Sequence, residues 1–230
     1  MKKIAIIVAG GTGHRMNSTI PKQFLLLQGK PILFHTLNQF KKANSSIILY
    51  VVLPKNQMDF WAKLCSEFPE INATTPHILV GGGETRFHSS QNGLAAITET
   101  EDCLIAIHDG VRPLIKPELI SSAFEYAELH GNAILSVPTK DSIRKWDSIS
   151  QKYVAVKRDE IRIIQTPQIF SLKSLRKAFN QSYSMEFTDD ASVIESTGET
   201  IHLVEGDYAN LKITTSEDLN LAESLMKSAY

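Results

Sequence analysis

A glycine-rich turn with two cations follows the first apolar run of the chain. The run, Ile4 to Val8, has the composition of a buried parallel strand, and residues 10–13 after it read Gly-Gly-Thr-Gly. Glycines let the backbone turn sharply and approach a ligand closely. Arg15 and Lys22 add positive charge beside the backbone N–H groups of this turn. The combination suits a polyphosphate, which needs both hydrogen-bond donors and cations.

Two common phosphate-binding motifs do not fit this turn. The dinucleotide fingerprint G-x-G-x-x-G would need a glycine where the chain has Met16. The P-loop ending Gly-Lys-Ser/Thr is absent from the stretch. The sequence therefore disfavours a dinucleotide oxidoreductase and a P-loop NTPase. A structural turn with two solvated cations is the plainer alternative for this segment.

Small, polar or charged residues also follow the later apolar runs. In a parallel sheet a ligand lies beyond the carboxyl ends of the strands, so we expect these residues to meet at one edge. Each cluster alone fits ordinary loop chemistry, but together they predict a site rich in cations and donors. The clusters are Gly81 to Gly83 with Glu84, Thr85, Arg86 and Ser89, Asp109 with Gly110 and Arg112, Thr139 to Asp141, Gln165 with Thr166, and Asn210 with Lys212.

Alternating strands and helices must position these clusters. The sequence predicts an α/β fold, with a single Rossmann-like, mostly parallel sheet covered by helices on both faces. Ser216 is the expected N-cap of the last helix. The strands are expected at 4–8, 47–53, 78–80, 103–107, 133–137, 161–165, 200–204 and 211–214, and the helices at 31–42, 58–68, 85–97, 117–129, 172–179, 191–194 and from 216.

Residues 139–160 interrupt this alternation with charged residues and interspersed β-branched ones, which favours an extended hairpin or arm. A charged excursion of this length is hard to place inside a compact domain. No linker, low-complexity tract or internal repeat divides the chain. We therefore expect one domain over residues 1–230, with an arm at about 139–160.

Composition excludes several classes of protein. The 230 residues are 43% hydrophobic, enough for a sizeable core, and the net charge of −1 gives no overall attraction to nucleic acid or an anionic membrane. The two cysteines, Cys65 and Cys103, do not form a zinc pattern. The sequence shows no signal peptide and no apolar run long enough to span a membrane, so we expect a cytoplasmic protein.

Six short motifs occur one after another along the chain. They are A-G-G-T-G-H-R-M with P-K-Q-F near the start, G-G-G-E-T-R-F-H-S-S at 81–90, H-D-G-V-R-P at 108–113, T-P-Q-I-F at 166–170, T-D-D-A-S at 188–192 and N-L-K-I-T at 210–214. From Ile4 to about Leu225 the chain resembles the 2-C-methyl-D-erythritol 4-phosphate cytidylyltransferases of the non-mevalonate isoprenoid pathway, which have a nucleotide-diphospho-sugar transferase fold. Ribitol-5-phosphate cytidylyltransferases share these motifs and are the main alternative.

The resemblance implies transfer of CMP from CTP to 2-C-methyl-D-erythritol 4-phosphate, giving 4-CDP-2-C-methyl-D-erythritol and pyrophosphate. A substrate phosphate oxygen would attack the α-phosphorus of CTP in line, and pyrophosphate would leave. A phosphomonoester is already ionised near neutral pH, so no general base is strictly needed. Positioning and neutralisation of charge would then supply most of the catalysis.

The resemblance also implies roles for individual residues. The catalytic residues would be Arg15, Lys22, Lys212 and Asp109. CTP would be bound by Ala9, Gly10, Gly11, Gly13, Arg15, Lys22, Gly82, Gly83, Arg86, Ser89 and Gly110, and the polyol phosphate by Asp109, Arg112, Ser142, Arg158, Thr166, Thr188 and Lys212. Two plainer roles stay open: Arg86 could brace its loop, and Asp109 could cap a helix. His108 is expected to point into the sheet, without a catalytic role.

The resemblance further implies Mg²⁺, or another divalent cation, and a homodimer. No carboxylate cluster with metal-ligand spacing stands out, so the triphosphate and water would hold the ion, with Asp109 as its expected protein contact. Arg158 matches an arginine that in this family reaches into the neighbouring subunit. Lys157 stands where relatives commonly have Asp, which leaves open whether it shares that role.

A protein that binds CTP without turning it over is an alternative from another functional class. Against it, the chain keeps Arg15, Lys22, Lys212 and Asp109, whereas a degenerate relative would have lost one of them. Binding of CTP without release of pyrophosphate would support this alternative, and tight NAD binding would mark an unrelated oxidoreductase.

Overall fold

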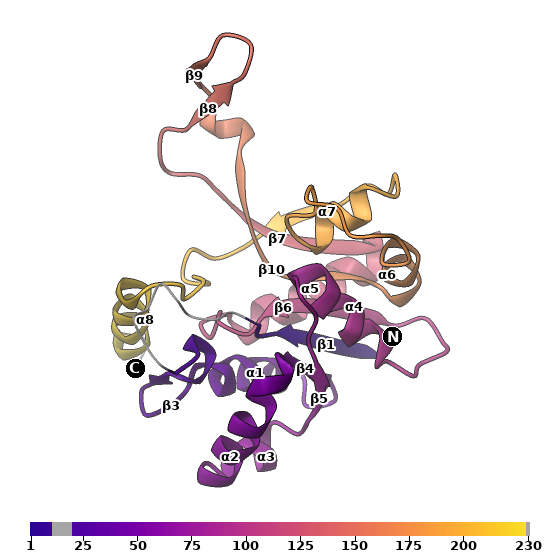
Figure 1. Cartoon of the computed structure of the whole chain (residues 1–230), viewed down its shortest axis with the longest axis vertical. Coiled ribbons are helices and arrows are strands. Elements are labelled where there is room, and N and C mark those ends of the chain that lie inside the picture. Colours follow the sequence, from indigo (N-terminus) through magenta and orange to yellow (C-terminus); the bar gives the residue numbers. More distant parts are fainter. Residues whose placement is uncertain (11–19, 229–230) are drawn as a thin grey trace.

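A seven-stranded sheet forms the centre of the computed structural model, which describes residues 1–10 and 20–228 (Figure 1). The strand order is β11-β7-β10-β6-β1-β4-β5. Strand β10 runs antiparallel to both of its neighbours, and the other adjacent pairs are parallel, so the expectation of a mostly parallel sheet is confirmed. The strands are β1 (Lys3–Val8), β4 (Ile48–Leu53), β5 (His77–Gly81), β6 (Leu104–Asp109), β7 (Asn132–Pro138), β10 (Arg162–Ser171) and β11 (Leu203–Glu205).

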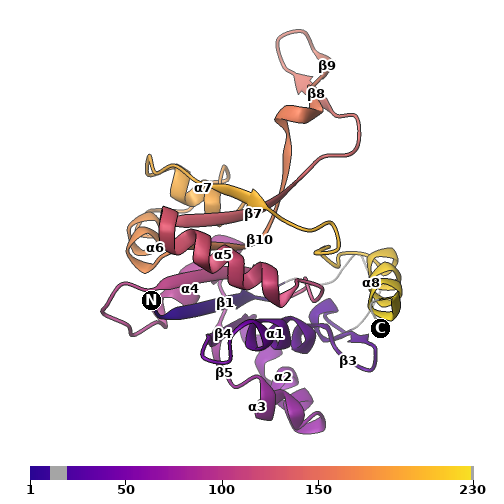
Figure 2. The same ribbon diagram turned by 180° about the vertical axis from the view of Figure 1, so that it is seen from behind.

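Helices cover both faces of this sheet (Figures 1 and 2). They are α1 (Ile32–Ala43), α2 (Met58–Glu67), α3 (Glu70–Thr74), α4 (Arg86–Ala95), α5 (Pro117–His130), α6 (Leu172–Ala178), α7 (Asp190–Glu195) and α8 (Ser216–Ser228). Short 3-10 helices at Lys22–Phe24, Lys55–Gln57 and Arg158–Glu160 and a small hairpin, β2 (Leu26–Leu27) with β3 (Lys30–Pro31), complete the described elements. Helix α3, this hairpin and the 3-10 helices were not predicted from the sequence.

Alternating side chains of the strands build two separate cores. In β1, Ala5 and Ile7 face the core formed with α1, α2 and α5, whereas Ile4, Ile6 and Val8 face the core formed with α4, α6 and α7. Successive side chains of a strand point to opposite faces of the sheet. Helices bury both faces of β1, so both faces carry apolar residues. This explains why the sequence of β1 is a continuous apolar run rather than an alternating one.

Strand β1 lies where the order of the sheet reverses, with β4 on one side and β6 on the other. Its last residue, Val8, is in register with Val52 of β4 and with Asp109 of β6. The backbone pairing continues just past the strand ends, since Ala9 N donates to Val52 O at 2.9 Å and Gly110 N donates to Val8 O at 2.8 Å. Ligands of open α/β sheets bind at such a reversal, so this edge is where a site is expected.

Three local predictions are wrong. Residues 211–214 do not form a strand: Ile213 is buried beside Val111 and its N–H donates to the Val111 carbonyl, so the apolar alternation reflects packing on a loop and on α8 rather than pairing with a strand. Gln165 and Thr166 lie inside β10, where its register shifts, and not at a strand end. The N-cap of α8 is Thr215 rather than Ser216.

Thr215 caps α8 through two reciprocal hydrogen bonds with Asp218, in which the side chain of each residue accepts from the backbone N–H of the other. The Asp218 N–H donates to Thr215 Oγ1 at 3.3 Å, and the Thr215 N–H donates to the Asp218 carboxylate at 2.9 Å. The same carboxylate accepts from the Thr214 N–H at 2.8 Å. This reciprocal arrangement satisfies N–H groups that a helix end leaves without partners.

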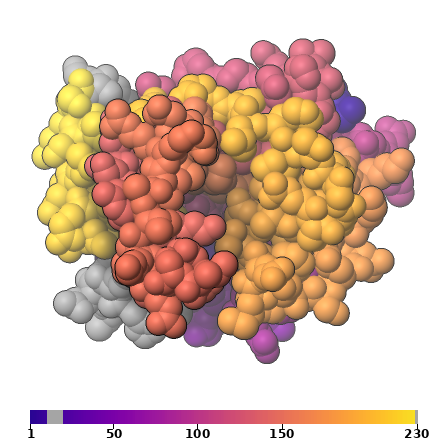
Figure 3. All heavy atoms as spheres, turned by 90° about the horizontal axis from the view of Figure 1, so that it is seen from above, coloured from indigo at the N-terminus to yellow at the C-terminus, as the bar shows by residue number. Residues whose placement is uncertain are grey.

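The excursion at residues 139–160 forms an arm that stands away from the sheet (Figures 1 and 2). Its tip is the hairpin of β8 (Arg144–Asp147) and β9 (Lys152–Ala155). Trp146 and Tyr153 are opposite each other in this hairpin, with ring centroids 5.0 Å apart, and both are at least half exposed. Seen from above, the arm lies between the C-terminal helix and the segment around residues 180–200 (Figure 3).

Candidate active site

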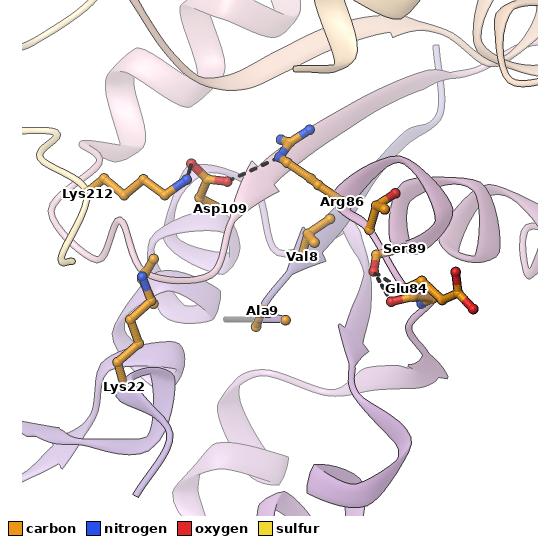
Figure 4. A pocket seen from close by; sticks show the side chains of 12 residues that line it. Val8, Ala9, Lys22, Glu84, Arg86, Ser89, Asp109 and Lys212 are labelled. Atoms are coloured by element: carbon orange, nitrogen blue, oxygen red, sulfur yellow. Dashed lines mark hydrogen bonds and ion pairs between the residues drawn. The ribbon is translucent and has the colours of Figure 1, made fainter. Parts of the chain in front are cut away.

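A cavity of about 260 Å³ opens at the carboxyl ends of β1, β5 and β6 (Figure 4). Strand β1 supplies its floor, the turn from β5 into α4 supplies one wall, and cations reach it from outside the sheet. Its lining consists of Val8, Ala9, Gly10, Lys22, Gly83, Glu84, Thr85, Arg86, Ser89, Asp109, Val111 and Lys212. Eight of these residues were predicted as site residues from the sequence, and they come from five separate segments of the chain.

The wall at the start of α4 is tightly built. Gly83 permits no side chain, because a Cβ there would lie 2.4 Å from the Cβ of His88. The Gly83 N–H donates to Ser89 Oγ at 3.2 Å, and Thr85 caps the helix by accepting from the His88 N–H. Gly82 continues the pairing of β5 through its N–H to Leu53 O at 2.7 Å. The turn therefore presents backbone groups and a helix N-terminus to the cavity in a fixed arrangement.

Asp109 is the electrostatic centre of the site. Its Oδ2 lies 3.1 Å from Lys212 Nζ and 3.2 Å from Arg112 Nε, and its Oδ1 lies 3.6 Å from Arg86 Nε. Figure 4 shows Lys212 and Arg86 approaching the carboxylate from opposite sides. Burial alone would raise the pKa of the Asp109 carboxyl, but the charges of Arg86, Lys212 and Arg112 together hold it well below its ordinary value. The carboxylate is thus ionised and shared among three cations.

Arg112 holds the loop that carries Lys212. Its Nη1 donates to the carbonyl of Asn210 at 2.7 Å, while its Nε pairs with Asp109. The Asn210 side chain in turn donates to Thr166 O at 2.8 Å, and Asn210 is fully buried. Arg112 itself is nearly buried and does not line the cavity.

His108 lies beneath Asp109 in the interior of the sheet, as expected from the sequence. The Asp109 N–H donates to Thr166 Oγ1 at 3.0 Å, and Thr166 Oγ1 lies 3.1 Å from His108 Nδ1. His108 Nε2 lies 3.3 Å from the carbonyl of Arg112. Burial lowers the pKa of His108 to about 3, so the ring is neutral; with Nε2 donating to Arg112, Nδ1 accepts from the Thr166 hydroxyl.

Arg86 joins two buried carboxylates. It forms an ion pair through Nη1 with Asp190, which is 1% exposed at its side chain, and it faces Asp109 through Nε. Ser90 Oγ also donates to Asp190, at 2.8 Å. These contacts are those of a residue that braces its loop. The pKa of Arg86 is raised because the attraction of Asp190 and Asp109 outweighs the opposing effect of burial.

Several predicted site residues lie away from the cavity. Gly110 and Thr166 are buried behind it, and an alanine Cβ at Gly110 would meet Ala9 Cβ at 2.8 Å. Thr188 is exposed just before α7. Ser142 and Arg158 are exposed on the arm, where Arg158 Nε lies 3.7 Å from Asp159. The expectations for Gly11, Gly13 and Arg15 fall outside the described residues.

Four residues of the lining were not predicted as site residues. Val8 and Val111 are apolar and carry no chemical signal in the sequence, although Val8 ends the first predicted strand. Thr85 and Glu84 were expected at this edge as part of the polar cluster after β5, but no role was assigned to them. Sequence reasoning also missed Asp190 as the ion-pair partner of Arg86, since the two lie 104 residues apart along the chain.

Neither a metal cluster nor a membrane span is found in the described part of the chain. Within residues 1–10 and 20–228, no three His, Cys, Asp or Glu side chains gather as a metal site. None of the helices described combines the length and apolar character needed to cross a bilayer.

Comparison with known proteins identifies the family. The sequence model of IspD, 2-C-methyl-D-erythritol 4-phosphate cytidylyltransferase, matches residues 3–228. A protein of that name from Bacteroides thetaiotaomicron is 43% identical over 226 residues, covering 98% of this chain and all of the relative. Among solved structures, the Francisella tularensis enzyme named 2-C-methyl-D-erythritol 4-phosphate cytidylyltransferase aligns with a TM-score of 0.79 at 31% identity, over 97% of this chain and 99% of that one. A 4-diphosphocytidyl-2C-methyl-D-erythritol synthase from Anaerococcus prevotii aligns with a TM-score of 0.81 at 26% identity, over 98% and 99%. The chain belongs to the IspD family of 2-C-methyl-D-erythritol 4-phosphate cytidylyltransferases, which are nucleotidyltransferases of isoprenoid biosynthesis.

Proposed function

We propose that the chain transfers CMP from CTP to 2-C-methyl-D-erythritol 4-phosphate in the cavity at the end of β1. The proposal rests on the positions of Lys22, Lys212 and Asp109. In a chain of this family, these three residues line one cavity where the strand order of the sheet reverses. A phosphate oxygen of the substrate attacks the α-phosphorus of CTP, the bond to the β-phosphate breaks, and pyrophosphate leaves with the electron pair. The attacking oxygen is already ionised, so the residues bind and neutralise charge rather than move a proton.

Lys22 and Lys212 are proposed to stabilise the negative charge that grows on the α-phosphate, together with Arg15. Both lysines line the cavity, and the 41% exposure of the Lys212 side chain leaves it accessible to a ligand. The Lys212 ammonium forms an ion pair with Asp109. Because Arg86 and Arg112 also face that carboxylate, Lys212 can move toward a phosphate without leaving Asp109 without a counter-ion.

The turn before α4 is proposed to read the cytosine. Gly82, Gly83 and Ser89 hold their backbone groups rigid, and rigid donors and acceptors can distinguish the exocyclic amine of cytosine from the carbonyl of uracil. Ala9 and Gly10 are proposed to lie along the nucleotide, because they continue β1 into the cavity. Gly110 supports this role from behind, since its lack of a side chain lets Ala9 take that position.

A divalent cation, Mg²⁺ or a substitute, is proposed to enter with the triphosphate. The described residues do not form a protein cage for it: no three His, Cys, Asp or Glu side chains gather among them, and three cations already share the charge of Asp109, the expected contact. When bound to the triphosphate, such an ion neutralises its charge and orients the leaving group. The residues of the chain then hold the complex through the lysines and the backbone of the two turns.

The arm is proposed to complete the site of a second copy in a homodimer. Arg158 and Ser142 are exposed on a projection away from their own cavity, which is where side chains that serve a neighbouring subunit would be found. Arg158, alone or together with Lys157, would bind the 4-phosphate of the polyol. Arg112, Thr166 and Thr188 would serve the substrate bound in their own subunit.

Release of pyrophosphate is the test of the reaction. The assay contains CTP and Mg²⁺ with either 2-C-methyl-D-erythritol 4-phosphate or ribitol 5-phosphate, and UTP and ATP replace CTP as controls. Turnover with the methylerythritol phosphate alone supports the proposal. Turnover only with ribitol 5-phosphate would keep the mechanism and change the substrate. CTP binding without turnover with either alcohol would refute a catalytic role.

Mixed dimers test the arm. Arg158→Ala and Lys22→Ala are each expected to be inactive alone, because one removes the arm contact and the other a phosphate contact. If the sites are shared, mixing the two variants restores one intact site per mixed dimer, up to about a quarter of wild-type activity. No recovery, in a mixture shown to exchange subunits, would mean that Arg158 serves its own subunit.

A further inference from the structure

We infer that Tyr208 is a positioning residue that fixes the loop carrying Lys212 against the base of the arm. The loop runs from Gly206 to Thr215, between β11 and α8, and has no regular secondary structure. In Figures 1 and 2 it passes below the point where the arm leaves the sheet. The inference rests on the proposed function, because it concerns the placement of Lys212 in that site.

Tyr208 makes two contacts with the base of the arm. Its hydroxyl donates to the carbonyl of Pro138, the last residue of β7, at 2.8 Å. The ammonium of Lys140 lies 3.5 Å from the centroid of its ring, within the range of a cation–π interaction. Tyr208 thus connects the loop to Pro138 and Lys140, where the arm begins, although at least 68 residues of sequence separate Tyr208 from either of them.

The neighbours of Tyr208 attach the loop to the body of the protein. Asp207 forms an ion pair with Lys116 at 2.7 Å, at the start of α5, and its carbonyl accepts from Gln165 Nε2 at 2.9 Å. Asn210 is fully buried and is held by Arg112. The loop is therefore anchored to the body before and after Tyr208.

Lys212 is exposed, and its backbone lies between two buried residues that anchor the loop, Asn210 and Ile213. It stands two residues after Asn210 and one before Ile213, whose N–H donates to Val111 O at 2.9 Å. A loop outside regular secondary structure can open locally, and each contact that holds it reduces the population of open states. Tyr208 supplies the contacts with the arm, so a displacement of the arm base is transmitted to the loop that carries Lys212.

Three substitutions separate the two contacts. Tyr208→Phe removes the hydroxyl and keeps the ring, Lys140→Met removes the charge above the ring, and Tyr208→Ala removes both contacts. Tyr126→Phe, on α5 and away from the loop, is the matched control. From the strength of such bonds we expect Tyr208→Phe to speed hydrogen exchange of the amides in 206–215 by about three- to tenfold, and Lys140→Met by about two- to fivefold.

A comparison in two backgrounds shows whether Tyr208 acts through Lys212. With Lys212 present, Tyr208→Phe is expected to lower kcat by about three- to tenfold with little change in the KM for CTP. In a Lys212→Ala background the same substitution should cause no further loss, because the group that it positions is already gone. A purely structural role would lower activity equally in both backgrounds.

Hydrogen exchange of the loop tests the inference, and turnover of substrate tests the proposed function. Unchanged exchange in 206–215 for Tyr208→Phe, or equal losses of kcat in the two Lys212 backgrounds, would overturn the inference. If no variant and no wild-type protein turns over substrate, the proposed function is refuted, and faster exchange confined to 206–215 would still support the attachment of the loop. Tyr126→Phe should change neither measurement.

Discussion

His108 should make the protein less stable as the pH falls from about 8 to about 5. Its pKa is about 3 in the folded protein against an ordinary value of 6.5, because burial disfavours the charged ring. At pH 5 the unfolded chain therefore binds a proton at this position that the folded protein does not bind. Stability that depends on the neutral ring is complete above pH 6.5 and is lost progressively as the pH falls toward the folded pKa.

The size of the effect follows from the two pKa values. The difference between 6.5 and about 3 corresponds to a maximum of about 5 kcal/mol, reached only at very low pH. Between about pH 8 and about pH 5, the loss is about 2 kcal/mol. Solvent screening does not reduce it, since the side chain is fully buried. Asp109 beside the ring keeps its charge over this range, because the cations around it hold the pKa of its carboxyl well below the ordinary value.

Urea unfolding at several pH values measures this loss, and His108→Gln is the comparison. Glutamine can still donate to the carbonyl of Arg112 but does not titrate. His35 and His77, whose pKa values are also lowered by burial, contribute equally to both proteins and cancel in the difference. We expect the wild type to lose about 2 kcal/mol more than the variant between about pH 8 and about pH 5.

Equal pH dependence in the two proteins would refute the reasoning. It would mean that His108 is not held neutral by its position in the sheet. If His108→Gln does not fold well enough to be studied, an NMR titration of the wild type gives the same answer. The ring signals of His108 should then show no titration over this pH range, and a midpoint near 6.5 would contradict the burial argument.

Three further predictions concern the site and the core beneath it. Lys22→Ala should lower kcat by about 10²–10³, measured by pyrophosphate release, because one group that neutralises phosphate charge is lost; a change in KM alone would contradict that role. Arg86→Met should destabilise the protein by about 3–5 kcal/mol in urea unfolding, since it leaves Asp190 buried without its cation, and Arg86→Lys should recover part of the loss. Gly93→Ala should cost about 1–3 kcal/mol, seen as a lower Tm, because the new Cβ would lie 2.7 Å from Ile6 Cγ2; an unchanged Tm would show that the core yields there.

The sequence predicted best those features that local pattern determines. Apolar runs located the seven strands of the sheet, although β10 ends at Ser171 rather than at the expected residue 165, and the residues just after β1, β5 and β6 supplied most of the cavity. Asp109 and the turn at Gly83 were found this way, because the end of a strand and a glycine turn are both local features. The rule that ligands lie beyond strand ends then placed them together without knowledge of the contacts.

Features that depend on distant contacts were not accessible to the same reasoning. The antiparallel direction of β10 follows from its pairing with β6 and β7, and no residue of β10 encodes a direction. Arg86 had two possible roles from the sequence, and its pairing with Asp190 became evident only when α7 was placed beside α4. Residues 211–214 had the alternation of a strand but pack on a loop, because alternation reports one buried side and not a neighbouring strand.

The arm connects two strands that are already neighbours in the sheet. Arg162, the first residue of β10, is in register with Pro138, the last residue of β7. The arm is therefore the enlarged loop of an ordinary antiparallel hairpin, and lengthening such a loop adds only slowly to the entropy of closing it. The length and tip of the arm can therefore change without altering the register of β7 with β10 or the edge of the sheet that carries the cavity. The separation of the projection from the cavity is thus a property of the topology.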